Sequence, residues 1–332
     1  MKKNIILIDF NLKPGWSMPE VLASATKEPW EVKQFQTNNM HGSRLATLRR
    51  MFWYFVFPLW IALHRKHYGR IIGWQQFFGL NFAFWCRLLH LRKVNDVTVL
   101  TFIYKRKNGF AGKLYHKYMS YIVNSKYIDR FVCFAREECN YYAQMFGTGR
   151  ERFVFIPLGI APVQCNDCSD EGYVFATGRS NRDYDFLTRV MQGTDYKCVI
   201  ACDNFTKPAD ADNVTVLDNC FGNSMIDAMA HCRCVAIPLK DANMSSGQLT
   251  ILQAMSLGKP VICSDVAGIK DYVENGSAMI IANDIDAWRR ALQAIGSDTQ
   301  YAARLSEKAQ ALFHSKFTEN AMFERISRAI MH

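Results

Sequence analysis

Short apolar runs of strand length recur along the first half of the chain and alternate with segments long enough for helices. These runs are Ile5–Ile8, Val97–Ile103, Arg130–Phe134 and Phe153–Pro157. Continuous apolar strands separated by helical segments are typical of a parallel sheet that is covered by helices. The pattern therefore predicts an α/β domain over residues 1–160.

The same alternation restarts after residue 171. Strands are expected at 173–177, 198–201, 214–217, 234–238 and 260–263, with helices at 183–191, 224–231 and 249–257. Between the two series, Ala161–Glu171 has the composition of a linker. The last segment, Tyr301–Ala329, has helical periodicity. We predict two α/β domains at 1–160 and 172–315, a linker at 161–171, and a C-terminal helix at 316–332, whose packing back on the first domain is one option.

Length and composition agree with two folded domains. The 332 residues exceed the roughly 100–200 of one ordinary domain. A content of 49% hydrophobic and 21% charged residues excludes disordered and collagen-like chains. The net charge of +10 is divided unevenly, because residues 1–150 hold 23 Lys and Arg against 8 Asp and Glu, whereas residues 151–332 hold 17 against 22. A negatively charged partner is therefore expected near the first domain.

Aromatic residues are concentrated in the same basic part of the chain. Residues 51–90 hold 13 of them, including Trp53, Trp60, Trp74 and Trp85. Aromatic and basic side chains together suit the interface of an anionic bilayer. We favour this interpretation over two others, a core with a solvated basic face and a stacking surface for single-stranded nucleic acid.

No segment has the features of a membrane span or a secretory signal. The longest apolar run, Met51–Leu63, has about 13 residues and contains Pro58, whereas a span needs roughly 20. The start, MKKNIILIDF, has no small-residue cleavage site. We expect a cytoplasmic protein that is peripheral on the inner face of the membrane.

The 11 cysteines are scattered along the chain, which fits a reducing cytoplasm. Cys165-x-x-Cys168 and Cys232-x-Cys234 suggest zinc as an alternative. The first pair, however, lies in the predicted linker and the second in a predicted buried strand. We therefore expect core or linker thiols here, and no metal.

Other catalytic motifs are weak or missing. Asp183-Tyr-Asp185 and Asp284-Ile-Asp286 have the D-x-D form of metal-dependent transferases, but each precedes a predicted helix, where Asp is a common cap. Neither a dinucleotide-binding glycine motif nor a P-loop motif occurs in the sequence. Dehydrogenase and P-loop functions are therefore not predicted, and no cofactor is expected.

The most informative stretch runs from Asn243 to Asp265. Ser245 or Ser246 is expected to cap a helix over 249–257, Gly258 to end it, and Pro260 to open a buried strand. A helix entered through Ser-Ser-Gly presents the N–H groups of Gly247, Gln248 and Leu249 at the positive end of its dipole. Such a turn suits a diphosphate, and the alternative is an ordinary capped helix that binds nothing.

Two segments carry a resemblance to a known family. One is Leu252–Asp265 together with Gly268, Asp271-Tyr-Val and Gly276, and the other is Phe175–Asp183. Together they resemble the family-4, retaining nucleotide-sugar glycosyltransferases of the GT-B fold. The resemblance covers about residues 172–290, and the first domain in layout only. It implies two Rossmann-like α/β/α lobes facing across a cleft, with the donor bound by the second lobe and the acceptor by the first.

The resemblance also implies a set of site residues. In the family an Arg and then a Lys contact the donor diphosphate. Arg179 matches the first, and Arg182 takes the place of the Lys in a loop that is two residues shorter. We take both as the catalytic pair. The expected donor-binding residues are Gly178, Asp183, Asn219, Ser245, Ser246, Gly247, Gln248, Leu249 and Gln253. The expected acceptor-binding residues are Gly15, Gln75, Gln76 and Lys105.

One departure from the family pattern concerns a Glu-x7-Glu pair near the donor sugar and ribose. Ser245 and Gln253 occupy those positions here. Gln253 retains hydrogen-bonding capacity for ribose hydroxyls but not the charge of a carboxylate. The base and the sugar of the donor are left open by the sequence, as are the acceptor and the linkage.

The resulting hypothesis is a retaining, metal-independent glycosyltransferase of bacterial surface-polysaccharide or glycoconjugate synthesis. It would move a sugar from a nucleotide sugar to a lipid-linked or saccharide acceptor at an anionic membrane surface, without nucleic acid as a partner. The missing glutamates motivate an alternative, a non-catalytic GT-B-like subunit that docks a partner enzyme to the membrane.

Overall fold

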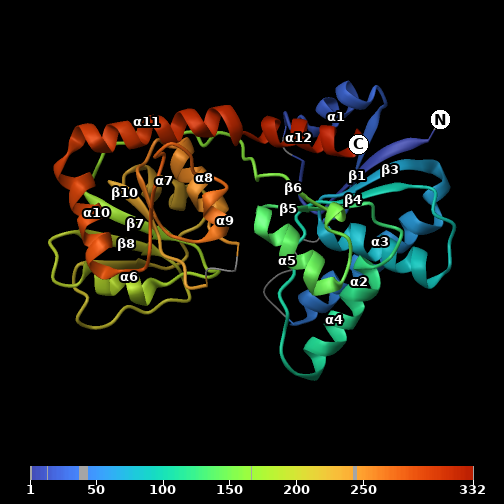
Figure 1. Ribbon diagram of the computed structural model, residues 1–332, viewed down its shortest axis with the longest axis horizontal. Helices are drawn as coiled ribbons and strands as arrows, with labels where there is room; N and C mark the ends of the chain where they lie inside the picture. The colour runs from blue at the N-terminus through green and yellow to red at the C-terminus, as the bar shows by residue number, and fades with distance from the viewer. Residues whose placement is uncertain (1, 13, 37–43, 166, 242–244, 332) are drawn as a thin grey trace. The chain divides into compact units, whose positions relative to one another are not determined.

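The computed structural model describes residues 2–12, 14–36, 44–165, 167–241 and 245–331 (Figure 1). The chain divides into two compact units. Unit 1 comprises Met1–Ile156 and Phe323–His332, and unit 2 comprises Pro157–Met322. Each unit is built on its own six-stranded sheet.

The sheet of unit 1 has the strand order β2-β1-β3-β4-β5-β6, and its neighbouring strands pair in parallel. The strands are β1 (Lys3–Ile8), β2 (Trp30–Gln34), β3 (Tyr68–Gly73), β4 (Asp96–Val99), β5 (Arg130–Cys133) and β6 (Phe153–Phe155). Each apolar run predicted in this unit overlaps a strand of this sheet. The run at 97–103 is strand only as far as Val99, because the chain turns at Thr101, which has a φ of 53°.

Helices of unit 1 follow the strands in a βαβ order. They are α1 (Met18–Thr26), α2 (Arg44–Leu63), α3 (Gln76–Leu88), α4 (Gly109–Val123) and α5 (Arg136–Phe146), with short 3-10 turns at Arg65–His67 and Arg150–Arg152. A further helix, α12 (Glu319–Met331), contributes its residues from Phe323 onward to unit 1.

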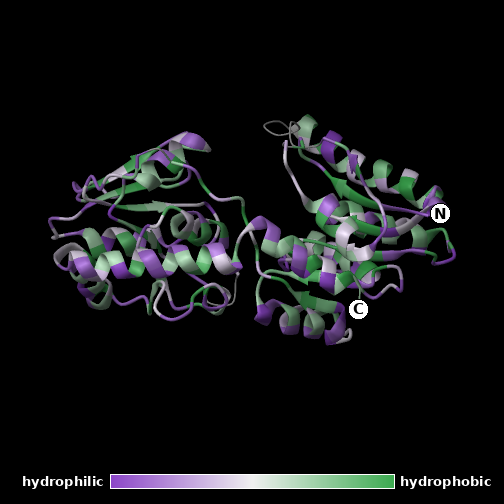
Figure 2. Cartoon of the chain, turned by 90° about the horizontal axis from the view of Figure 1, so that it is seen from above, coloured by the Kyte–Doolittle hydropathy of each residue, from purple (hydrophilic) through white to green (hydrophobic). Residues whose placement is uncertain are grey.

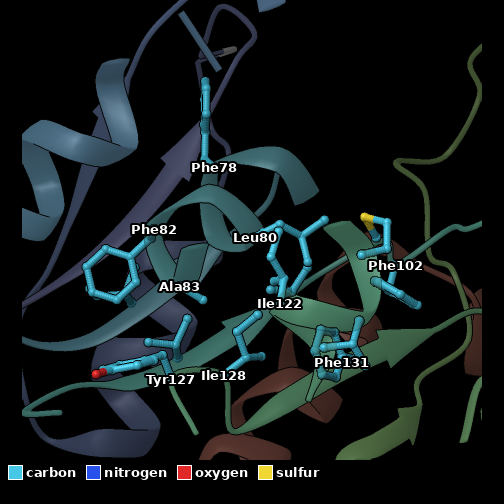
Figure 3. Packing of buried hydrophobic residues seen from close by; sticks show 14 of the residues in the cluster. Phe78, Leu80, Phe82, Ala83, Phe102, Ile122, Tyr127, Ile128 and Phe131 are labelled. Atoms are coloured by element: carbon cyan, nitrogen blue, oxygen red, sulfur yellow. The ribbon is translucent and has the colours of Figure 1, made fainter. Parts of the chain in front are cut away.

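The core of unit 1 is rich in aromatic rings (Figure 3). Phe78, Phe82, Phe102 and Phe131 are each at most 1% exposed, and the rings of Phe102 and Phe131 lie 4.9 Å apart. Many aromatic residues of the 51–90 segment therefore belong to the core. This agrees with the alternative interpretation of the segment as a core with a solvated basic face. Trp60, however, is 45% exposed on α2.

A second aromatic cluster joins the beginning of unit 1 to α12. The rings of Trp16 and Trp74 are 5.4 Å apart, and each also contacts the ring of Phe323, at 5.8 and 6.1 Å. Phe323 is fully buried. Since its contacts lie on segments near residues 16 and 74, this part of α12 is an integral piece of unit 1.

The sheet of unit 2 has the order β12-β11-β10-β7-β8-β9, again with parallel pairing. Its strands are β7 (Tyr173–Thr177), β8 (Lys197–Ala201), β9 (Val214–Leu217), β10 (Cys234–Ile237), β11 (Val261–Ser264) and β12 (Met279–Ile281). Its helices are α6 (Tyr184–Met191), α7 (Asn223–Ala230), α8 (Gln248–Ser256), α9 (Ala267–Lys270), α10 (Ile285–Ser297) and α11 (Thr299–Lys316). Two separate clusters of buried apolar side chains stabilise this unit.

The predicted linker is part of unit 2. The N–H of Ile160 donates to the carbonyl of Phe317 at 3.1 Å, and the N–H of Val163 donates to Ser256 Oγ at 2.8 Å. The division between the units therefore falls at Ile156, before the predicted linker.

The segment with helical periodicity, 301–329, contains two helices. Helix α11 ends at Lys316 and α12 begins at Glu319. Between the two helices the backbone pairs with Ile160 as in a parallel β-bridge. The N–H of Ile160 donates to the carbonyl of Phe317, and the N–H of Glu319 donates to the carbonyl of Ile160 at 2.9 Å. The continuous periodicity of the sequence hides this break.

Strands in both units are coloured predominantly as hydrophobic, whereas many helices alternate between hydrophobic and hydrophilic positions (Figure 2). This pattern is the one expected for parallel sheets covered by amphipathic helices. Within the described ranges, no helix combines the length and the apolar character that are needed to cross a bilayer.

Candidate functional site

The loop after β7 is shaped around one arginine. Gly178 has a φ of 110°, a backbone conformation that glycine adopts without strain. A Cβ atom at this position would lie 2.6 Å from Nη2 of Arg182 and 2.9 Å from its Cζ. Glycine at position 178 therefore makes room for the guanidinium of Arg182.

Arg182 is half-buried and is held by uncharged acceptors. Its Nε donates to the carbonyl of Thr177 at 2.9 Å, its Nη1 to the carbonyl of Ser180 at 2.9 Å, and its Nη2 to Thr250 Oγ1 at 3.0 Å. The described residues form no ion pair with it. Burial lowers the pKa of Arg182, but arginine stays protonated in proteins. The result is a positive charge beside the first turn of α8 that no carboxylate of the described ranges neutralises.

The start of α8 differs from the prediction. Gly247, with a φ of 91°, is the N-cap, and no side chain caps the helix. The predicted serine caps are wrong because both hydroxyls are engaged elsewhere. Ser246 Oγ accepts from Asn181 Nδ2 at 3.1 Å, and Ser245 Oγ accepts from Gln248 Nε2.

Asn181 fastens the loop after β7 to the loop before α8. Its Nδ2 donates to the carbonyl of Asp241 at 3.0 Å, and its Oδ1 accepts from the N–H of Asp241 at 2.9 Å. It has a φ of 58°, a conformation that Asn tolerates better than most residues. Asn181 lies within Phe175–Asp183, but no sequence pattern predicts a role for its side chain. Asn243 and Met244, which begin the predicted loop, lie outside the described residues.

Arg179 points to different neighbours from those of Arg182. Its Nη2 lies 2.5 Å from Asp203 Oδ2, and its guanidinium lies over the ring of Phe221, 4.7 Å from the centroid. The side chain of Arg179 is 55% exposed. The other oxygen of Asp203, Oδ1, accepts from the N–H of Asn219 at 3.0 Å. The side chain of Arg179 therefore contacts residues at the carboxyl ends of β8 and β9, whereas that of Arg182 contacts the start of α8.

A groove of about 500 Å³ lies beside β9 and the loop that precedes it. Its lining residues are Asp203, Phe205, Thr206, Lys207, Asp212, Val214, Thr215, Val216 and Asp218. Three carboxylates against one ammonium group disfavour a diphosphate in this groove. An anionic group is better accommodated where Arg182 meets α8.

The remaining donor-binding candidates differ in how free their side chains are. Asp183 caps α6 by accepting from the N–H of Phe186 at 3.1 Å. Gln248 is buried, whereas Leu249 is exposed and Gln253 is partly exposed on α8. Gln253 is therefore more accessible to a ligand than Gln248.

Two of the acceptor-binding candidates have their amide groups engaged in the fold. Gln75 caps α3 by accepting from the N–H of Phe77 at 3.3 Å, and its Nε2 donates to Asp9 Oδ2 at 2.7 Å. Gln76 Oε1 accepts from the N–H of Ile103 at 3.1 Å.

The other two acceptor-binding candidates are open to solvent. Lys105 is exposed in the loop after β4. A Cβ atom on Gly15 would meet nothing within 4 Å.

The second D-x-D motif has a structural role in the fold, and the Cys232-x-Cys234 pair lies in the core. Asp284 caps α10 by accepting from the N–H of Ala287 at 2.8 Å. Cys232 and Cys234 are buried free thiols. Among the residues that the structure describes, no group of three or more His, Cys, Asp and Glu is placed to hold a metal ion.

Comparison with known proteins adds a family match and a fold. Residues 182–298 match the model of the family described as Glycosyl transferases group 1. This segment contains Arg182, Asp203 and all of α8. A search of curated proteins found no match.

Solved structures similar to this chain extend over both units. HepE of Anabaena, in complex with UDP and glucose, matches with a TM-score of 0.67 and 13% identity over 100% of both chains. Sucrose-phosphate synthase of Thermosynechococcus elongatus matches with a TM-score of 0.69 and 13% identity over 99% of this chain and 98% of its own. The chain has the GT-B fold.

The GT-B resemblance predicted from the sequence is thus confirmed. A third GT-B structure, WaaG, is a glycosyltransferase involved in lipopolysaccharide biosynthesis. It matches with a TM-score of 0.62 and 13% identity over 99% of both chains. Assignment to family 4 and the retaining stereochemistry stay predictions.

Proposed function

We propose that this GT-B protein is a glycosyltransferase that takes its sugar from a nucleotide-sugar donor. The observation that carries the proposal is the half-buried guanidinium of Arg182, which has no carboxylate partner among the described residues and lies 3.0 Å from Thr250 at the start of α8. A helix start without a side-chain cap adds unpaired N–H groups and the positive end of the helix dipole. Together they form a site for a diphosphate.

The chemistry follows from the charge that develops during transfer. When the bond between the sugar and the diphosphate breaks, negative charge grows on the leaving phosphate oxygens. Fixed positive groups lower the energy of that state more than that of the bound donor. In this proposal Arg182 and the N–H groups of α8 stabilise the leaving group, Arg179 contributes a second guanidinium, and Gln253 binds ribose hydroxyls. The reaction is metal-independent and retaining.

The ligands bound in structures of one similar protein support a uridine nucleotide as the first donor to test. HepE was solved with UDP, with UDP and glucose, and with UDP-glucose. The proposal for this chain therefore begins with UDP-sugars, and the donor's sugar is to be found by a panel.

For the acceptor we propose a lipid-linked or saccharide molecule of bacterial surface-polysaccharide or glycoconjugate synthesis, at the cytoplasmic face of the membrane. Two exposed parts of unit 1 support the membrane location. Helix α2 exposes Leu45, Leu48 and Phe52 by 59–77%. The loop before α4 exposes three consecutive basic residues, at 105–107, and α4 exposes Phe110 by 84%.

These two parts belong to the same edge of the sheet. Helices α2 and α4 each follow a parallel strand and run back antiparallel to it, so both begin at the carboxyl edge. Exposed apolar and basic side chains at one edge are the combination that binds an anionic bilayer. We therefore propose an anionic membrane surface as a partner of unit 1.

The test is nucleotide binding and sugar transfer by matched arginine variants. Arg182→Ala is expected to weaken UDP binding at least about tenfold, because it removes a charge-assisted contact worth roughly 1.5–3 kcal/mol. Arg233→Ala is the control, since Arg233 pairs with Asp170 just before β10, at the opposite edge of the same sheet. Equal UDP affinity in the Arg182 and Arg233 variants contradicts the proposed site.

A non-catalytic subunit is the second candidate function. It is favoured by one observation, the presence of Ser245 and Gln253 where the resembled family has two carboxylates. Calorimetry with UDP and GDP separates the candidates, together with turnover measured on a panel of UDP-sugars. Nucleotide binding with turnover supports the transferase, and firm vesicle binding without any nucleotide binding supports the docking subunit.

A further inference from the structure

Asp203 connects the carboxyl ends of three neighbouring strands. It follows β8, its Oδ2 pairs with Arg179 after β7 at 2.5 Å, and its Oδ1 accepts from the N–H of Asn219 after β9 at 3.0 Å. Arg179 is held on its other side by the ring of Phe221 at 4.7 Å. One carboxylate thus fixes the position of a guanidinium that the proposed function assigns to the donor.

The two arginines differ in their electrostatic state. Arg182 has no described carboxylate partner, whereas the charge of Arg179 is balanced by Asp203. The pair is open to solvent, since the side chains of Arg179 and Asp203 are 55% and 28% exposed. Exposed ion pairs of this kind are weak and exchange readily for a stronger anion. A diphosphate carries more negative charge than one carboxylate and presents several acceptor oxygens.

We propose that Asp203 is a positioning residue that holds Arg179 at the ends of β8 and β9 in the ligand-free protein and yields it to the diphosphate when the donor binds. This inference rests on the proposed function. When the donor binds, Arg179 gives up its ion pair with Asp203. The loss of this pair offsets part of the binding free energy that Arg179 gains from the diphosphate. Asp203 therefore lowers donor affinity and makes the release of the nucleoside diphosphate easier.

The substitution Asp203→Asn tests the charge with little change of shape. The amide oxygen of Asn still accepts from the N–H of Asn219, so the contact between the β8 and β9 ends is kept. The negative charge and the acceptor oxygen that hold Arg179 are both lost, because the atom facing Nη2 of Arg179 becomes the amide Nδ2, which is a donor. We expect Asp203→Asn to bind UDP about three- to tenfold more tightly than the wild type in calorimetry.

A double-mutant cycle shows whether Asp203 acts through Arg179. Arg179→Ala should weaken UDP binding, and Asp203→Asn should then change the affinity less than about twofold in the Arg179→Ala background. A role that is only structural would lower the melting temperature without producing this dependence. Asp265→Asn is the control, because it removes another exposed pair, Lys270–Asp265 at 2.6 Å, at the end of β11. It should leave UDP affinity unchanged.

The possible results separate this inference from the proposed function. If the wild type binds UDP and Asp203→Asn binds it equally or more weakly, the inference is overturned and the proposed function stands. The inference is also overturned if Asp203→Asn raises UDP affinity equally in the wild type and in Arg179→Ala. Asp203 would then act on the ligand directly, as a distant negative charge, and not through Arg179. If the wild type binds neither UDP nor GDP, the proposed function fails, and this inference fails with it.

Discussion

Gly178 shows how one residue without a side chain decides where a charge can lie. The guanidinium of Arg182 occupies the space in which a Cβ atom would stand, with Nη2 2.6 Å from that position. The close approach lets Arg182 reach Thr250 while it still donates to the strand end at Thr177. The glycine at position 178 therefore allows the backbone conformation and the space that place the positive charge of Arg182 at the candidate site.

We predict that Gly178→Ala lowers the free energy of unfolding by about 1–3 kcal/mol, because alanine is strained at positive φ, and weakens UDP binding by displacing Arg182. Gly193→Ala is the matched control. Gly193 also has a positive φ, of 70°, but a Cβ atom there meets nothing within 4 Å. Denaturant unfolding and calorimetry measure both effects. Similar UDP affinity in the two variants would show that the space around Arg182 does not matter for binding.

The sequence predicts part of this residue-scale arrangement. Gly178, Arg182 and the start of α8 were expected at one site, and the structure brings Arg182 to Thr250. The pairing of Arg179 with Asp203 could not be predicted, since it depends on which strand lies next to β7. Neighbouring strand ends are set by sheet order, and periodicity along the chain carries no information about that order.

At the scale of elements, the segment after Ile156 is attached to unit 2 by specific bonds. The hydroxyl of Ser256, the last residue of α8, accepts from the N–H of Val163. The side chain of Lys259 donates to the carbonyl of Cys168 at 2.9 Å. Helix α8 thus has the candidate site at its first turn and the incoming chain at its last turn.

Removal of the Ser256 hydroxyl leaves the N–H of Val163 without its acceptor. We predict that Ser256→Ala lowers the free energy of unfolding by about 1 kcal/mol, because the half-buried N–H of Val163 loses its hydrogen bond. Ser297→Ala is the control, because Ser297 is also the last residue of a helix, α10, but its hydroxyl donates to Gln293 on an exposed surface. It should change stability by less than about 0.5 kcal/mol. Equal losses in urea unfolding would refute the assigned role of Ser256.

Strands with continuous apolar runs could be predicted, and the edge strand β2 could not. Its sequence, Trp-Glu-Val-Lys-Gln, has only two apolar residues, because one of its edges has no neighbour in the sheet. The break between α11 and α12 is likewise invisible in the helical periodicity of 301–329. It is made by a partner far away in the sequence, Ile160, which pairs with Phe317 and Glu319.

At the scale of the whole molecule, the charge is divided between the units. The excess of basic residues lies in residues 1–150, and the exposed basic loop at 105–107 lies among exposed apolar side chains of unit 1. Unit 2 contains the candidate nucleotide site. Composition predicts the uneven charge, and the family resemblance implies a donor site in the second domain. Both the site and the membrane contact stay predictions.

We predict that the protein sediments with vesicles containing phosphatidylglycerol at low salt and is released at high salt, since the attraction is screened by ions. Lys105→Glu with Lys107→Glu should weaken binding at least about tenfold, because each basic residue near the surface contributes about 1 kcal/mol. Arg304→Glu with Lys308→Glu, on the exposed side of α11 in unit 2, is the control. Vesicle binding that does not change with salt, or an equal loss of vesicle binding in both double variants, would argue against membrane contact through the loop at 105–107.

Phe323 has a consequence for how the protein is made. Trp16 and Trp74 belong to segments that leave the ribosome early, whereas the ring that packs against both is translated only after all of unit 2. Domains generally fold in the order of their synthesis, but here the earlier unit has to keep an apolar surface uncovered until the later one is complete. A nascent chain stopped before Phe323 would contain every strand of both sheets, yet its first unit would remain unfinished.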